Sequence, residues 1–129
     1  MSSLPDDVLA GGVIRSTEMN AVLAALRLIY GDVQVKDVSY PVLASDFAIL
    51  ADDTSGSIDI TLPAATSEGK VYLIVKTNSS ANHVMILTTG SDNIDGHSAM
   101  QLDTQYDKLL LLCDGLGNWL IVSSIGTPH

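Results

Sequence analysis

The chain has 129 residues, which is enough for one domain with a small appendage. Fifteen acidic residues against six basic ones give a formal net charge of −9, so phosphate backbones and anionic lipid surfaces repel it, and we expect neither a nucleic-acid nor a membrane partner. The hydrophobic fraction of 47% excludes disorder of the whole chain and leaves apolar surface that could be buried between subunits.

Residues 1–31 predict an extended arm followed by an amphipathic helix. The arm, residues 1–13, shows no sustained period and lacks the basic start and long apolar run of a signal peptide. A helix over residues 16–30 begins at Ser16 or Thr17, which can cap it, and ends before Gly31. Its wide apolar stripe predicts a protein interface, formed by Met19, Val22, Leu23, Leu26, Ile29 and Tyr30.

That stripe must be covered, because an isolated helix of this length is only marginally stable in water. It could pack on the β domain of its own chain, bundle with copies of itself, or dock on another protein. We therefore assign residues 1–31 to attachment or oligomerisation and residues 32–129 to a separate domain.

Residues 32–129 predict a mainly β domain. Short apolar or alternating runs are separated by turn residues, as in Ile58, Ile60 and Leu62, which alternate with polar side chains. This spacing favours an antiparallel β-sandwich or a barrel-like domain over a parallel α/β sheet. The expected strands cover residues 33–35, 47–50, 58–62, 71–77, 84–88, 108–113 and 119–123.

The run from Leu109 to Cys113 is apolar on both faces of its expected strand. Leu109, Leu111 and Cys113 point to one side, and Leu110 and Leu112 to the other. We expect the domain core to cover one face and the N-terminal helix or a neighbouring subunit to cover the other. Leu110 and Leu112 therefore join the candidate interface residues.

No motif for catalysis or for a cofactor occurs in the chain, which has no nucleophile elbow, phosphate-binding loop, zinc-protease helix or C-x-x-C pair. The three histidines are far apart in the sequence. The acidic cluster from Asp92 to Gly96 fits a turn better than a calcium loop. We expect no catalytic residue, no cofactor and no metal, and we expect Cys113 to be a buried thiol without a partner.

Several short segments, taken in order, resemble the small β domains of bacteriophage tail-fibre and particle-surface proteins. The segments are residues 44–50, Ile60–Ala65 with its Leu-Pro-Ala, 69–76 with Gly-Lys-Val-Tyr, 94–96 and 114–119. The resemblance implies a virion component, commonly a homotrimer, that attaches through its N-terminal part and displays the β domain. It carries over no catalytic residue.

The chain is short and has no repeated shaft, which favours a capsid decoration (cement) protein or a short head fibre. Such a protein would be made in the host cytoplasm, would contact the major capsid protein or another virion protein, and would reside on the virion. The alternative is a tail-fibre or tail adaptor protein that binds a host receptor or glycan, with Asp92, Asp95, His97 and Trp119 as candidate contacts. A polysaccharide hydrolase would need two carboxylates at a fixed separation, and nothing in the sequence pairs them.

Overall fold

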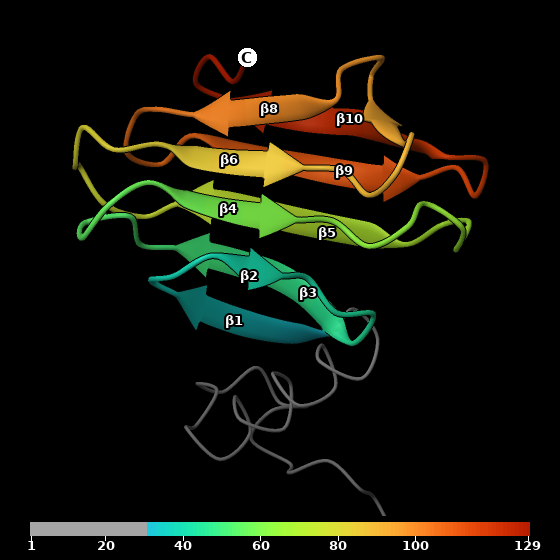
Figure 1. Ribbon diagram of the computed structural model, residues 1–129, viewed down its shortest axis with the longest axis horizontal. Coiled ribbons are helices and arrows are strands. Elements are labelled where there is room, and N and C mark those ends of the chain that lie inside the picture. The colour runs from blue at the N-terminus through green and yellow to red at the C-terminus, as the bar shows by residue number, and fades with distance from the viewer. Residues whose placement is uncertain (1–30) are drawn as a thin grey trace, which may run out of the picture. The chain divides into compact units, whose positions relative to one another are not determined.

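The computed structural model describes residues 31–129 of the chain (Figure 1), the second of two units into which the chain divides after Tyr30. The expected arm and the expected helix over residues 16–30, with its six interface candidates, lie outside the described residues. The described residues are mainly β and include no helix. They thus offer no helix long and apolar enough to cross a membrane.

The described strands form two sheets, and in Figure 1 the four-stranded sheet lies in front of the six-stranded one. The six-stranded sheet has the order β1 (Asp32–Lys36), β3 (Asp46–Ala51), β5 (Val71–Lys76), β9 (Lys108–Cys113), β10 (Asn118–Ile125), β7 (Asn93–Ile94). The four-stranded sheet has the order β2 (Tyr40–Pro41), β4 (Ile58–Thr61), β6 (Val84–Leu87), β8 (Ala99–Leu102).

From β1 to β9 the chain changes sheet at every connection. As a result β1, β3 and β5 pair in parallel in one sheet, and β2, β4 and β6 pair in parallel in the other. Only β9 and β8 then add antiparallel neighbours to β5 and β6, and β10 adds one to β9. The expectation of an antiparallel domain was therefore wrong, because both sheets are mixed.

The sequence did not reveal the parallel pairing because of the way in which the chain connects the parallel strands. Parallel neighbours need a long connection, which is usually a helix. Here the connection is a strand of the opposite sheet. The sequence between two parallel neighbours therefore has no helical pattern from which parallel pairing could be predicted. The β class of the domain and its two-layer packing agree with the sequence, whereas the strand directions do not.

One apolar core lies between the sheets, and the alternation of side chains along each strand builds it. In β4, Ile58 and Ile60 are buried and Asp59 is exposed. In β9 the predicted alternation is confirmed, since Leu109, Leu111 and Cys113 are buried while the intervening leucines are only half-buried. The rings of Tyr72 and Trp119 pack in the same core with centroids 5.3 Å apart.

A buried ion pair joins the end of β5 to the loop that follows β3. The Nζ of Lys76 donates to Oδ1 of Asp53 at 2.6 Å, and both side chains are fully buried. The Ser80 hydroxyl donates to the same carboxylate oxygen at 2.9 Å, and Asn82 donates to the Asp53 carbonyl oxygen at 2.8 Å. The second carboxylate oxygen of Asp53 has no hydrogen-bond partner. The lysine ammonium is therefore the main compensation for this buried charge.

We expect Lys76→Met to lower the free energy of unfolding by about 3–5 kcal/mol, because it leaves the Asp53 charge buried and unpaired. The double variant Lys76→Met with Asp53→Leu should lose less than the single one, since it removes both charges. Urea unfolding followed by circular dichroism measures both. Lys108→Met, a lysine without such a partner, is the control and should change stability by no more than about 0.5 kcal/mol. A loss at Lys76→Met as small as in this control would contradict the role given to the pair.

Candidate functional site

The outer face of the six-stranded sheet, which points away from the core, is apolar across five strands. The strand register identifies the residues of this face, because residues paired across neighbouring strands point to the same side of the sheet. The paired positions on this face are apolar except for Lys108, Ser123 and the Asn93–Asn118 pair at the β7 edge. Its apolar members are Val33, Val35, Ala48, Leu50, Val71, Leu73, Val75, Leu110, Leu112, Leu120 and Ile125. We call these eleven residues the outer apolar face.

Several of these side chains are well exposed, whereas Ala48 and Val75 are buried. Val35 is 71% exposed and Val33 is 50% exposed on β1, and Ile125 is 56% exposed on β10. Leu110 and Leu112 are half-buried in the middle of the sheet. The structure thus places these two predicted interface residues on the face opposite the core. Their paired neighbours are Val71 and Leu73 on β5 and Leu120 and Ser123 on β10, three of them apolar.

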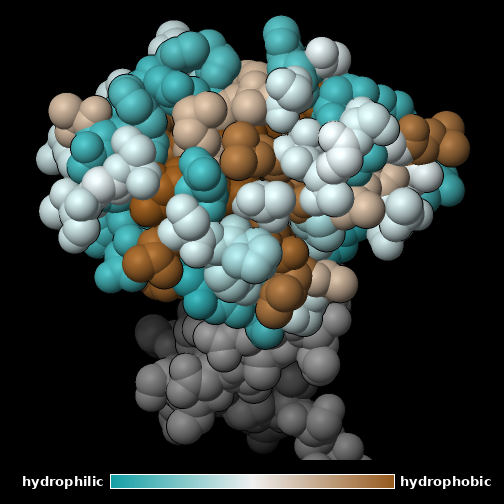
Figure 2. Space-filling view, viewed as in Figure 1, coloured by the Kyte–Doolittle hydropathy of each residue, from teal (hydrophilic) through white to brown (hydrophobic). Residues whose placement is uncertain are grey.

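The outer face of the four-stranded sheet differs in character. Its outward positions mix polar residues such as Asp59, Thr61 and Gln101 with the half-buried Met85 and Leu87. Figure 2 shows this side of the domain, where hydrophobic residues form separate spots among hydrophilic ones. The continuous apolar surface is therefore a property of one sheet and not of both.

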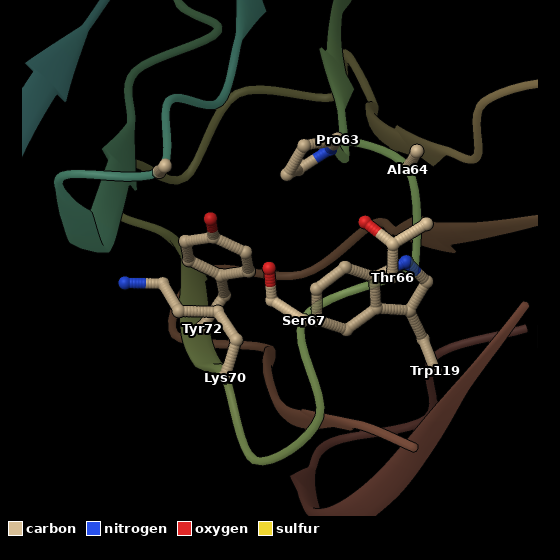
Figure 3. A pocket seen from close by; sticks show the side chains of 8 residues that line it. Pro63, Ala64, Thr66, Ser67, Lys70, Tyr72 and Trp119 are labelled. Carbon is tan, nitrogen blue, oxygen red and sulfur yellow. The ribbon is translucent and has the colours of Figure 1, made fainter. Parts of the chain in front are cut away.

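A cavity of about 370 Å³ opens at the end of the sandwich near the start of β5 (Figure 3). Its wall contains the buried rings of Tyr72 and Trp119, and its rim carries the exposed hydroxyl residues Thr66 and Ser67. The remaining lining residues are Ala44, Pro63, Ala64 and Lys70. All but Thr66 and Ser67 come from segments that carry the resemblance, so four separated segments of the sequence converge on one cavity.

The side chains of Lys70 and Tyr72 contact each other at one end of this cavity. The Lys70 ammonium lies 4.8 Å from the centre of the Tyr72 ring and donates to the Asp46 carbonyl oxygen at 2.8 Å. The Tyr72 hydroxyl donates to the Leu43 carbonyl oxygen at 3.1 Å. Burial, followed by the negative charge of Asp46, raises the pKa of Tyr72 to about 12. The phenol therefore stays neutral and acts as a fixed donor.

The turn between β9 and β10 positions Trp119 at the other end. Oδ2 of Asp114 accepts from the Asn118 side chain at 2.6 Å, and Oδ1 accepts from the Leu116 amide at 2.7 Å. These hydrogen bonds lower the pKa of the Asp114 carboxyl, and the bond from the Asn118 side chain has the largest effect. Gly115 has φ of +77°, and a Cβ there would lie 3.0 Å from that of Glu68, so the turn requires glycine. Trp119 then enters the core with 1% of its surface exposed.

The structure brings together three of the four candidate receptor contacts and buries the side chain of the fourth, Trp119. Asp92, Asp95 and His97 lie together around β7, and Asp95 and His97 are exposed. Asp92 is half-buried and accepts from the Ala65 amide at 2.7 Å, which ties the loop to the segment after β4. The Asp95 amide donates to the Trp119 carbonyl oxygen at 2.9 Å, but the Trp119 ring is in the core and presents no platform on the loop surface.

Sequence reasoning missed a polar cluster on the four-stranded sheet. Asp103 contacts Nδ1 of His83 at 2.6 Å and Nε2 of His129 at 3.3 Å, and it accepts from Gln101 at 2.6 Å. Burial raises the pKa of Asp103, but the bonds from Gln101 and His83 outweigh it and lower the pKa. Among residues 31–129 no group of three or more His, Cys, Asp or Glu side chains is arranged to hold a metal ion. This cluster joins segments far apart in the sequence, and the backbone amide of His83 also donates to the Ser57 hydroxyl at 2.9 Å.

No protein-family model and no curated protein sequence matches the chain.

The raised pKa of Tyr72 predicts a loss of stability in alkali. Its folded pKa of about 12 exceeds its usual value of 10.0, so the stabilisation is complete below pH 10 and is lost as the pH rises towards 12. Tyr72→Phe should be less stable than the wild type at neutral pH by about 1 kcal/mol through loss of the bond to Leu43. Urea unfolding at several pH values should show this difference shrinking above pH 10. A difference that stays constant up to pH 11 would contradict the assignment.

Proposed function

We propose that this chain is a structural protein of a bacteriophage particle that acts by protein–protein contact and not by catalysis. The observation that carries the proposal is the outer apolar face. A sheet with one face in water normally alternates apolar and polar side chains. Here both faces of β3, β5 and β9 are apolar, on a chain with a net charge of −9.

An apolar surface of this kind marks a contact site, because single soluble domains expose only small contiguous apolar patches. Covering it with another protein contributes about 25 cal/mol for each Å² of apolar surface removed from water. The partners we propose are copies of the same chain in a homotrimer and the major capsid protein or another virion protein. Leu110 and Leu112 lie at the centre of this contact, and the predicted N-terminal helix provides a second contact element.

The role on the particle that we favour is capsid decoration or a short head fibre, with the domain stabilising or decorating the shell. One observation supports it, the resemblance of residues 44–119 to particle-surface domains. The alternative is a tail-fibre or tail adaptor protein that binds a host receptor or glycan. The exposed positions Asp95 and His97, which share one loop region, favour that alternative.

If the outer apolar face is an interface, the chain associates with copies of itself. One charged side chain placed on this face should disrupt that association. Leu112→Asp should convert an oligomer into a monomer in sedimentation-velocity experiments and leave the far-ultraviolet circular dichroism spectrum unchanged, because the side chain lies outside the core. The control is Leu87→Asp, an equally half-buried leucine on the outer side of the four-stranded sheet, which should remain oligomeric. A Leu112→Asp protein that sediments like the wild type would exclude this face as the interface.

Attachment to the particle is tested at the predicted helix. Leu26→Asp introduces a charge into the middle of the apolar stripe and should abolish decoration of purified particles, measured by antibody–gold labelling. Label over the head in the wild type supports the decoration role, and label at the tail end supports the alternative. A Leu26→Asp protein that decorates particles normally would show that the helix is not the anchor.

A further inference from the structure

We propose that the side chains of Lys76 and Asp53 become joined by an amide bond. The Lys76 Nζ attacks the Asp53 Cγ, one carboxylate oxygen leaves as water, and the two charges disappear together. The reaction needs no oxidant and no second molecule, because the ammonium and the carboxylate contain all the atoms of the amide and the water. The buried ion pair described above is its starting state. This modification is independent of the outer apolar face.

The two reacting groups are held close together in the folded domain. The Lys76 Nζ lies 2.6 Å from the Asp53 Oδ1. The bond from Cγ to Oδ1 is about 1.2 Å long, so the Cγ lies less than about 4 Å from the Nζ. Reacting atoms held at about 3–3.5 Å gain a large rate advantage from proximity alone. Pairing of Ala51 with Lys76 across parallel β3 and β5, and the bond from Asn82 to the Asp53 carbonyl, fix both partners.

Burial of the pair favours the uncharged amide. Both side chains are fully buried, and the Asp53 Oδ2 has no hydrogen-bond partner among the described residues. A charged carboxylate oxygen without a donor is costly where water is excluded. As the carbonyl oxygen of an amide the same atom carries no formal charge, and buried carbonyl oxygens without a full set of partners are tolerated more often.

The Ser80 hydroxyl provides a path for the protons. It accepts from the Lys76 Nζ at 3.3 Å and donates to the Asp53 Oδ1 at 2.9 Å. The ammonium must lose two of its three protons, and the leaving oxygen must gain two. The direct contact and the Ser80 relay both lead from Nζ to Oδ1, so Oδ1 leaves as water and Oδ2 stays as the amide oxygen. The hydrogen left on Nζ can donate to the Asn78 Oδ1, which lies 3.4 Å from Nζ.

The bond would close residues 53–76 into a covalent ring that contains β4 of one sheet and β5 of the other. A chain with one cysteine cannot form an internal disulfide, and an amide link restricts the unfolded chain in a similar way. Unfolding could then not separate the end of β5 from the loop after β3, and a reducing agent could not break the link.

The intact mass of the full chain tests the proposal. The wild type should be lighter than its sequence by about 18 Da, the mass of the water lost in the modification. Lys76→Met and Asp53→Ala should have their full sequence masses, and the control Lys108→Met should keep the loss. Asp53→Asn should release ammonia in place of water and reach the same mass as the linked wild type. Trypsin should not cleave after the linked Lys76, and the digest should contain one branched peptide that carries both residues.

A cyclic imide at an Asp–Gly step, 95–96 or 114–115, would cause the same loss of mass. Mild hydroxylamine cleaves an imide and leaves an amide intact, and an imide would persist in Lys76→Met. A wild-type chain that keeps its full mass after days of incubation in the folded state would overturn the proposal. So would a mass loss that persists in Lys76→Met, or a digest without the branched peptide.

The relay is tested by the rate at which a newly synthesised chain loses mass. Ser80→Ala keeps both reacting groups and removes the hydroxyl between them, so it should slow the loss by about 100-fold, as expected for a lost proton relay. Ser79→Ala changes the exposed neighbouring serine and should link at the wild-type rate. Linking of Ser80→Ala at the wild-type rate would overturn the role given to Ser80.

Discussion

The chain crosses from one sheet to the other at each connection from β1 to β9, and most other features of the domain depend on this constraint. Each pair of successive strands adds one strand to each sheet, and both strands direct side chains into the shared core. Neighbouring strands lie about 4.8 Å apart, and the sheets pack about 10 Å apart. Inward side chains such as Ile49, Ile60 and Ile74 are therefore fully buried, and the outward ones align in rows across the sheet.

Those rows connect the fold to the proposed function. Parallel register places Val33, Ala48 and Leu73 side by side, and antiparallel β9 extends the row with Leu110. A local preference for β-branched and aliphatic residues in each strand thus becomes a continuous apolar surface only after the strands stack. The cavity arises in the same way, because the loops before and after the strands of one end converge around Tyr72 and Trp119. Contact surface and cavity are consequences of stacking, and no single segment encodes either of them.

The strands with a strong local pattern were predictable from the sequence. The alternation in 58–62 and the apolar run in 108–113 located β4 and β9 to within a residue, and the run correctly separated Leu110 and Leu112 from the core. The two-residue strands β2 and β7 were missed because they are too short to show a period. Strand β8, Ala99–Leu102, was missed because Gln101 is its only clearly polar outward residue. Pairing direction depends on partners far away in the sequence, and no local pattern reports it.

The central claim is that the outer apolar face contacts another protein chain. A photo-crosslinking amino acid at position 112 of the full chain tests it most directly, with position 87 on the other sheet as the matched site. Irradiation should join position 112 covalently to a second copy of the chain, in dimer and trimer bands, while position 87 should give no such product. If position 112 yields no crosslinked product, or no more than position 87, the face is not an interface between copies and the proposed homotrimer is contradicted.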